Sequence, residues 1–301
     1  MSILVIGEAL IDLTIDERSA PPRRDSHVGG SPANVALGLG RLGDAVELLT
    51  ALAEDDGGRR IAAHLASAGV IVRPESWALD ATATARARLN ADGSADYDFD
   101  IRWVLPPDAA LGSPSLVHTG SIATYLEPGC ETSLALIRAA RRRGALVTFD
   151  PNVRPGLIDD ADAARARILA VAAQCDVLKL SDEDAQWLFP GGDAIERLLA
   201  AGPWLVVVTA GSRGSTLAIA EERIAVPAAA ADVADTIGAG DSYMAMLVHE
   251  LARLAGPAAA RAHLRSSRAL QALGSRCAAA AAITVSRHGA NPPTLAEIDD
   301  R

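Results

Sequence analysis

The stretch DTIGAGDSYMAML, residues 235–247, places two glycines and an alanine between two aspartates, directly before an apolar pattern with helical spacing. Gly238 and Gly240 let the backbone approach a ligand, and the first N–H groups of the following helix have no partner within that helix. These amides and the helix dipole suit a phosphate or a negatively charged transition state. Asp241, in the first turn, is placed to accept the proton of an attacking hydroxyl during phosphoryl transfer. The alternative is that both aspartates only stabilise the helix start.

A second glycine-rich stretch, VGGSPANVALGLGRLG at residues 28–43, contains the spacing GxGxxG in its second half. A dinucleotide fingerprint must lie between a strand and the start of a helix. Here Ser31 as N-cap and Pro32 as the first helical residue predict an earlier start, so the spacing falls late in the helix. We therefore expect its glycines to allow close helix packing; they are Gly38, Gly40 and Gly43.

The start of that second stretch is where we expect a ligand. Gly29 and Gly30 leave room against the backbone, and Asn34 offers an amide donor and acceptor from the first turn. An amide beside bare backbone suits sugar hydroxyls.

Three further polar stretches follow apolar runs. FDPNVR (149–154) follows a predicted strand, KLSDEDAQWL (179–188) has a helix-capping pattern, and VTAGSRG (208–214) can cradle a phosphate or form a hairpin turn. Each of them has an ordinary structural explanation as well. His118 is similar, because it can contact a substrate or make a structural hydrogen bond.

The elements that position these residues follow from hydrophobic periodicity. Short β-branched runs such as ILVIG, SLVHTG, ALVTFD, DVLKL and WLVVVTAG alternate with Ala/Leu/Arg-rich segments of helical spacing. This alternation predicts an α/β fold with a mostly parallel central sheet between two layers of helices. Ligand sites in such sheets lie at the carboxyl ends of the strands.

One region departs from the alternation. The stretch from 82 to 104 alternates apolar and polar residues around the turn signal NADGSA, which predicts a β-hairpin. Together with the polar segment 13–28, it is expected to form a small β lid inserted into a single domain of residues 1–301. We expect Trp103 on this lid, covering a ligand or sealing a homodimer, because exposed strand edges tend to pair.

Composition excludes several classes of protein. The 301 residues include 28 Lys and Arg against 38 Asp and Glu, a net charge of −10, which argues against nucleic-acid binding and against an anionic membrane surface. No apolar stretch approaches the roughly 20 residues of a membrane span. Three distant cysteines indicate neither a disulfide framework nor a zinc site and fit a cytoplasmic protein.

Taken in order, these motifs resemble the ribokinase-like, or PfkB, family of carbohydrate kinases across nearly the whole chain. GGSPANVALGLGRLG and DTIGAGD carry the resemblance, and GEALIDL, DPNVRP and SRHGANPP are most similar to fructokinases. The resemblance implies an α/β sandwich with a β lid, ATP and Mg²⁺ as cofactors, and phosphorylation of a sugar CH₂OH group.

The resemblance also implies roles for residues of this chain. Catalysis is assigned to Asp241 as base and to an anion hole at Gly238, Ala239 and Gly240. The sugar is assigned to Asp12, Gly29, Gly30, Asn34, Arg88 from the lid, Asn152 and Arg154. ATP is assigned to Lys179, Ser181, Asp184, Thr209, Gly211, Gly214 and Cys277, the last as a packing residue at the adenine pocket. Backbone carbonyls near Asp235, Ile237, Thr284, Arg287 and Gly289 are assigned to K⁺.

This chain departs from the family pattern at several places, and Ala53 stands where a glycine is common. Ile237 replaces a threonine, Ser181 and Asp184 replace an asparagine and a glutamate of the nucleotide and Mg²⁺ motif, and Pro293 cannot offer a serine hydroxyl to a monovalent cation. The shorter carboxylate of Asp184 must therefore reach the metal's water shell.

The leading hypothesis is an ATP-dependent kinase of fructose or a related ketose or keto sugar acid. A nucleoside kinase on the same fold is the nearer alternative, disfavoured because four Trp, three Tyr and three Phe leave few aromatic rings to stack a base. A catalytically silent sugar-binding regulator is the other alternative, opposed by the complete GAGD motif.

Overall fold

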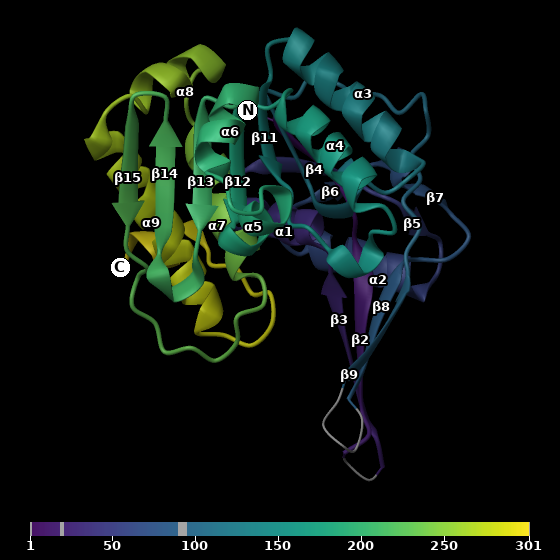
Figure 1. Cartoon of the computed structure of the whole chain (residues 1–301). Helices are drawn as coiled ribbons and strands as arrows, with labels where there is room; N and C mark the ends of the chain where they lie inside the picture. Colours follow the sequence, from purple (N-terminus) through teal and green to yellow (C-terminus); the bar gives the residue numbers. More distant parts are fainter. Residues whose placement is uncertain (1, 19–20, 90–94, 301) are drawn as a thin grey trace.

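The central element of the computed structural model, which describes residues 2–18, 21–89 and 95–300, is a large twisted sheet (Figure 1). Its nine strands lie in the order β15-β14-β13-β12-β11-β10-β1-β4-β6. In this spatial order, each strand from β13 across to β6 pairs in parallel with the next. At the other edge, β14 pairs antiparallel with both β13 and β15. The strands are β1 (Ser2–Ile6), β4 (Ala45–Leu49), β6 (Ile71–Val72), β10 (Leu116–Gly120), β11 (Leu146–Asp150), β12 (Val177–Ser181), β13 (Leu205–Thr209), β14 (Ser215–Ile219) and β15 (Glu222–Val226).

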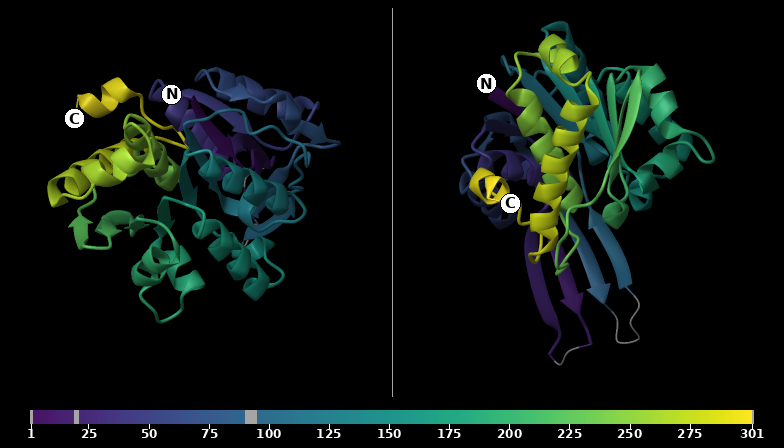
Figure 2. Two further views of the ribbon diagram at one scale, coloured as in Figure 1. Left: turned by 90° about the horizontal axis from the view of Figure 1, so that it is seen from above. Right: turned by 90° about the vertical axis from the view of Figure 1, so that its left-hand side faces the viewer.

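Helices cover both faces of this sheet (Figure 2). The α-helices are α1 (Ser31–Arg41), α2 (Asp56–Ala66), α3 (Gly129–Arg142), α4 (Ala161–Ala172), α5 (Asp182–Leu188), α6 (Ala194–Ala201), α7 (Ala239–Ala252), α8 (Pro257–His263), α9 (Ser267–Val285) and α10 (Leu295–Asp299). Four short 3₁₀ turns also occur in the described residues: η1 (Pro74–Ser76), η2 (Ser121–Thr124), η3 (Pro155–Leu157) and η4 (Gly211–Arg213). No helix of the described residues is both long enough and apolar enough to cross a lipid bilayer.

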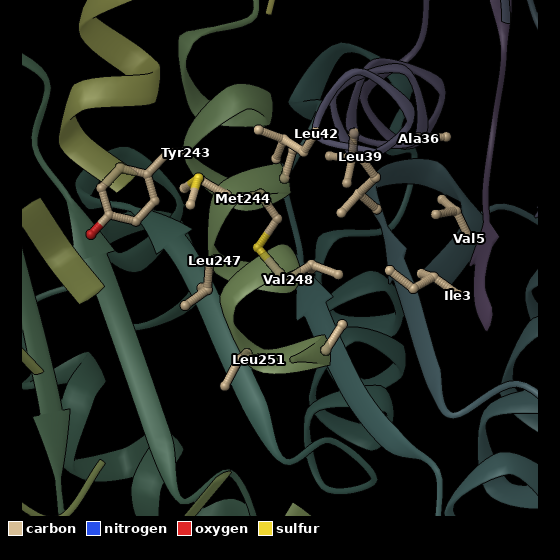
Figure 3. Packing of buried hydrophobic residues seen from close by; sticks show 14 of the residues in the cluster. Ile3, Val5, Ala36, Leu39, Leu42, Tyr243, Met244, Leu247, Val248 and Leu251 are labelled. Carbon is tan, nitrogen blue, oxygen red and sulfur yellow. The ribbon is translucent and has the colours of Figure 1, made fainter. Parts of the chain in front are cut away.

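Alternate residues of the strands point into two separate hydrophobic cores. Ile3 and Val5 of β1 pack with α1, α7 and α9, whereas Leu4 and Ile6 pack with α3, α4 and α6. Figure 3 shows the first core, where the apolar faces of α1 and α7 meet beside β1. The predicted three-layer α/β sandwich is therefore confirmed.

The closeness of α1 and α7 explains one late glycine of the second motif. A β-carbon at Gly38 would lie 2.7 Å from the β-carbon of Ala245 on α7, so only glycine allows this helix contact. The GxGxxG spacing lies at and just beyond the end of α1, away from any strand–helix turn. The expected role in close packing is confirmed for Gly38 and for Gly40, where a β-carbon would lie 2.3 Å from Ala68 O. It is wrong for Gly43, which has φ +89° and open space where a β-carbon would be.

A second sheet of four strands projects from the main body (Figures 1 and 2). Its order is β3-β2-β8-β9, with β2 (Leu10–Asp16), β3 (Arg23–Gly29), β8 (Thr84–Leu89) and β9 (Ala95–Asp100). The predicted hairpin is present as β8 and β9, although most of its NADGSA turn lies outside the described residues. A short pair, β5 (Leu52–Ala53) and β7 (Trp77–Leu79), lies nearby.

The placement of Trp103 on this second sheet was wrong. The chain leaves the sheet after Asp100, and the Trp103 side chain is only 1% exposed, buried in the second core against Gly129 of α3. Its large apolar surface is removed from water there, so it covers no ligand and seals no dimer.

Candidate active site

The carboxyl ends of β11, β12 and β13 and the start of α7 enclose a cleft of about 490 Å³. Its position agrees with the rule that open α/β sheets bind ligands beyond the carboxyl ends of their strands. The cleft is lined by Asn152, Val153, Arg154, Pro155, Lys179, Ser181, Asp182, Glu183, Asp184, Trp187, Thr209, Gly211, Thr236, Gly238, Gly240 and Asp241.

The start of α7 presents backbone amides to this cleft. Gly238 is the N-cap, with φ +76°, a left-handed conformation that glycine adopts without strain. The Ala239 amide donates to Thr236 O at 3.3 Å, whereas the amides of Gly240 and Asp241 have no acceptor one turn earlier in the helix. Among the described residues, the amides of Gly238, Gly240 and Asp241 have no backbone acceptor, so these amides are open to an anion.

The Asp241 carboxylate is held by the first turn of α1. Ser31 Oγ donates to its Oδ1 at 2.7 Å, and Asn34 Nδ2 donates to its Oδ2 at 2.8 Å. Ser31 is the first residue of α1 and Gly30 the N-cap, one position earlier than predicted. This register is why the Ser31 hydroxyl reaches Asp241 instead of capping its own helix.

Residues assigned to the sugar come from the ends of β2 and β3 and from α1. Asp12 reaches over Gly29, where a β-carbon would lie 1.9 Å from Asp12 Oδ2, and Gly30 has φ +100°. Asp12, Gly29, Gly30 and Asn34 thus lie along one path that ends at Asp241.

Arg88 is not brought to this path. In the lid register Ala85 lies opposite Asp12, whereas Arg88 is three residues farther out, opposite Ile15. The Arg88 guanidinium pairs there with Glu17 at 3.1 Å on the exposed surface. The strand register therefore places the Arg88 backbone about 10 Å farther along the lid than the position opposite Asp12.

A buried ion pair lies beneath the start of α7. Lys179 Nζ lies 2.7 Å from Asp150 Oδ2, and a β-carbon at Gly240 would lie 3.1 Å from Lys179 Nζ. Burial raises the pKa of Asp150 to about 6, against the opposing effect of Lys179. Burial also disfavours the Lys179 charge, but Asp150, Asp241 and Asp184 outweigh it and raise the pKa of the ammonium group. Lys179 is therefore a fixed positive charge below the helix terminus.

Asp184 is mainly engaged with the backbone. Its Oδ1 accepts from Val153 N at 2.8 Å and its Oδ2 from Ser181 N at 3.1 Å, while Ser181 Oγ accepts from Asp184 N. This is the predicted capping pattern, and it links the loop after β11 to the start of α5. Asn152, in that loop, has φ +35°, a strained conformation of the kind that clusters at functional sites.

The other residues assigned to ATP divide into two groups. Thr209, Gly211 and Ser181 line the cleft. Gly214 lies in the turn before β14, and the Cys277 side chain is fully buried in the first core, so neither lines the cleft. Cys277 fills space in that core, as expected of a packing residue.

The residues assigned to a monovalent cation come from two adjacent segments. Asp235 accepts hydrogen bonds from the amides of Ile237 and Gly289, and the Arg287 amide donates to Thr284 O at 3.0 Å. The structure thus brings the 235–237 and 284–289 segments together beside the start of α7. No group of three or more His, Cys, Asp or Glu side chains arranged to hold a metal occurs among the described residues.

Sequence reasoning missed two polar residues at this site. Ser31 contacts Asp241, and Glu8 lies buried just after β1, where burial raises its pKa to about 7. The Ser121 hydroxyl lies close enough to lower this pKa, yet Glu8 Oε2 has no hydrogen-bond partner of good geometry in the described chain. Glu8 lies in GEALIDL and Ser31 in VGGSPANVALGLGRLG, so both could have been identified from the motifs around them. His118 was interpreted in two ways, and its Nδ1 makes a structural hydrogen bond with Thr148 Oγ1 at 3.0 Å.

The chain is similar in sequence to known proteins named as fructokinases. The chain is 34% identical to a fructokinase of Rhizobium leguminosarum bv. trifolii over 83% of this chain and 79% of that protein. It is 31% identical to probable fructokinase-4 of Arabidopsis thaliana over 98% and 95% of the two chains.

Solved structures give the same result. A fructokinase with bound ATP from Xylella fastidiosa superposes with a TM-score of 0.87 at 26% identity, covering 99% of this chain and 97% of that one. An aminoimidazole riboside kinase from Salmonella enterica, 23% identical with a TM-score of 0.80 and 100% and 99% coverage, shares the fold. The model of the pfkB family carbohydrate kinases matches residues 1–297, and the chain belongs to that family.

Proposed function

We propose that this protein transfers the terminal phosphoryl group of ATP to a hydroxymethyl group of fructose or a closely related ketose or keto sugar acid. The observation that carries the proposal is that three features lie together at the start of α7. The Asp241 carboxylate is bound by Ser31 and Asn34 of α1, the first amides of α7 are beside it, and Lys179 lies under Gly240. The curated relatives named fructokinase support the choice of a ketose.

In this proposal the sugar lies along Asp12, Gly29, Gly30 and Asn34, with its hydroxymethyl oxygen at Asp241. The carboxylate accepts the hydroxyl proton late, since phosphoryl transfer is loose and deprotonation need not precede it. The amides of Gly240 and Asp241 stabilise the charge on the migrating group, because they are fixed before the reaction starts.

Two cationic side chains complete the electrostatics. Lys179 lies under Gly240, and Arg154, at the cleft wall, is close enough to Glu8 to lower the pKa of that acid. We assign Lys179 to the transferring phosphoryl group and Arg154, with Asn152, to the substrate side of the cleft. The ATP phosphates then follow Ser181, Thr209 and Gly211.

The residues present fit Mg²⁺ held largely through phosphates and water. Carboxylates of Asp182, Glu183 and Asp184 line the cleft, and oxygen ligands with retained waters are what Mg²⁺ prefers. Because both Asp184 oxygens already accept backbone amides, Asp184 would act through the metal's water shell. Bound Mg²⁺ neutralises phosphate charge during transfer. The 235–237 and 284–289 segments are proposed to hold K⁺ through backbone carbonyl oxygens.

The second sheet is proposed to close over the sugar and exclude water from the phosphoryl group. Phe99 of β9 lies beside η3 of the main body, with its ring 3.8 Å from where a β-carbon of Gly156 would be, so the sheet already contacts the body. The edge strands β3 and β9 pair on one side only within the described lid, which favours a homodimer through this sheet.

The structure weakens the nucleoside alternative. Trp103, counted among the lid aromatics, is buried in the core and cannot stack on a base, which leaves Phe99 as the described aromatic side chain of the lid that is partly exposed.

An ADP-release assay with fructose, tagatose, ribose, 2-keto-3-deoxygluconate, fructose 1-phosphate and adenosine tests the proposal. One ketose or keto sugar acid is expected to give the highest kcat/KM, with a phosphorylated product by mass spectrometry. Preference for adenosine, or ADP release that no acceptor accelerates, would contradict it.

A further inference from the structure

The hydroxyl of Ser31 makes a contact that helix capping does not explain. Ser31 is the first residue of α1, and the N-cap role belongs to Gly30. Its Oγ donates to Asp241 Oδ1 at 2.7 Å, across 210 positions of sequence. The Ser31 residue is 6% exposed, so its hydroxyl is committed to this contact and has little access to a ligand.

The two oxygens of Asp241 are held by side chains of different accessibility. Oδ1 is bound by buried Ser31, whereas Oδ2 is bound by Asn34, which is half-buried and lies on the sugar-side path. A sugar hydroxyl that binds the Asn34 side chain can replace the Asn34 amide as the donor to Asp241 Oδ2. Ser31 is then the remaining side-chain donor that fixes the rotation of the carboxylate.

The backbone holds Ser31 firmly in this position. The N-cap Gly30 has φ +100°, and a β-carbon there would meet Glu8 O at 2.6 Å, so the turn before Ser31 is packed against the end of β1. Asn34 N donates to Gly30 O at 2.9 Å, which closes the first helical turn. The donor is therefore rigid relative to the sheet.

We propose that Ser31 is a positioning residue for phosphoryl transfer, whose hydroxyl holds Asp241 Oδ1 so that Oδ2 faces the acceptor hydroxyl. The inference rests on the proposed function of Asp241 as the base. Its effect is on the orientation and the acidity of that carboxylate, because a donor to a carboxylate stabilises the charged form.

Three titratable groups near Asp241 interact with it electrostatically. Glu8 from the end of β1 and Asp150 from β11 are acidic neighbours, whereas Lys179 from β12 is cationic. Substituting Ser31 leaves all three in place, so the comparison of Ser31→Ala with Ser31→Thr isolates the lost hydrogen bond.

The test compares Ser31→Ala with Ser31→Thr, which keeps a hydroxyl, and with Ser133→Ala, which removes a buried serine hydroxyl from α3. Ser31→Ala is expected to lower kcat about tenfold, since a hydrogen bond to a charged group has that magnitude or more. The KM for sugar and ATP should stay within about twofold, and the acidic limb of the pH–kcat profile should move up by about one unit. Ser31→Thr should restore most of kcat, and Ser133→Ala should change neither parameter. A Ser31→Ala protein with the wild-type kcat and acidic limb would overturn the proposal.

A second measurement does not depend on turnover. Carboxyl-carbon NMR of protein labelled at aspartate, with the Asp241 signal identified by its loss in Asp241→Asn, gives the pKa of this group directly. A rise of about one unit in Ser31→Ala supports the positioning role, and an unchanged pKa overturns it. If the wild type phosphorylates no sugar, the proposed function fails, and this titration still decides whether the Ser31 hydroxyl holds the Asp241 carboxylate.

Discussion

Removing the Lys179 ammonium group separates its contribution to stability from its contribution to catalysis. Lys179 and Asp150 lie 2.7 Å apart, with side chains 5% and 1% exposed. Lys179→Met leaves the Asp150 carboxylate buried without its cation, which costs about 3–5 kcal/mol of unfolding free energy. For a chain of 301 residues the unfolding entropy is roughly 0.6 kcal/mol/K, so Tm should fall by about 5–8 °C.

The deficit should depend on pH. Burial already raises the pKa of Asp150 to about 6, and loss of Lys179 raises it further. Below that pKa the carboxyl is neutral, so Lys179→Met should be destabilised less at pH 5 than at pH 8. Chemical denaturation at the two pH values measures the difference.

A double variant distinguishes the two roles. Lys179→Met with Asp150→Leu removes both buried charges and should recover most of the lost stability. Its kcat should remain about 100-fold or more below wild type, because the positive charge under Gly240 is still absent. The exposed pair Arg223–Asp193 provides the control, since Arg223→Met should change stability by less than about 1 kcal/mol. Wild-type stability and turnover in Lys179→Met would refute this reasoning.

Three further predictions concern other parts of the chain. Glu8→Gln should stabilise the protein by up to about 3 kcal/mol at pH 8 and by little at pH 4.5, as measured by urea denaturation across this range. The pKa of Glu8 is about 7 in the folded protein against an ordinary value of 4.5, so ionisation of the buried acid lowers stability as pH rises between these values. Gly38→Ala should lower the free energy of unfolding by about 1–3 kcal/mol through its clash with Ala245, and a second change, Ala245→Gly, should restore it; an unaltered Gly38→Ala protein would contradict the tight α1–α7 contact. Adding ATP with Mg²⁺ should change tryptophan fluorescence through Trp187, which lines the cleft, and a signal that persists in Trp187→Phe would place the nucleotide elsewhere.

Much of the fold could be predicted because buried parallel strands are short, continuous apolar runs. β10, β11 and β13 lie within the predicted segments, and β1 and β12 overlap theirs with a shift of one residue. The departure of the chain from the lid before Trp103 was not predicted, since alternation of apolar and polar residues does not show where a strand leaves its sheet. The side-chain burial of Trp103 depends on α3, which is distant in sequence.

The candidate site was predicted in its backbone parts and less completely in its side-chain contacts. Glycines and first-turn amides mark the start of α7 by local rules, which is why the GAGD segment could be identified. The contact of Ser31 with Asp241 and the distance of Arg88 from Asp12 depend on helix packing and strand register. Neither is encoded in the spacing of neighbouring residues.

The measurement that tests the catalytic role of Asp241 most directly is sugar-dependent ADP formation by Asp241→Asn, made alongside calorimetric titration of ATP. The substitution keeps the size of the side chain and removes its ability to accept a proton. We predict that the variant binds ATP with near wild-type affinity and forms ADP at least about 100-fold more slowly when sugar is present. Unchanged turnover with the same preferred sugar would show that phosphoryl transfer does not use Asp241 at the start of α7.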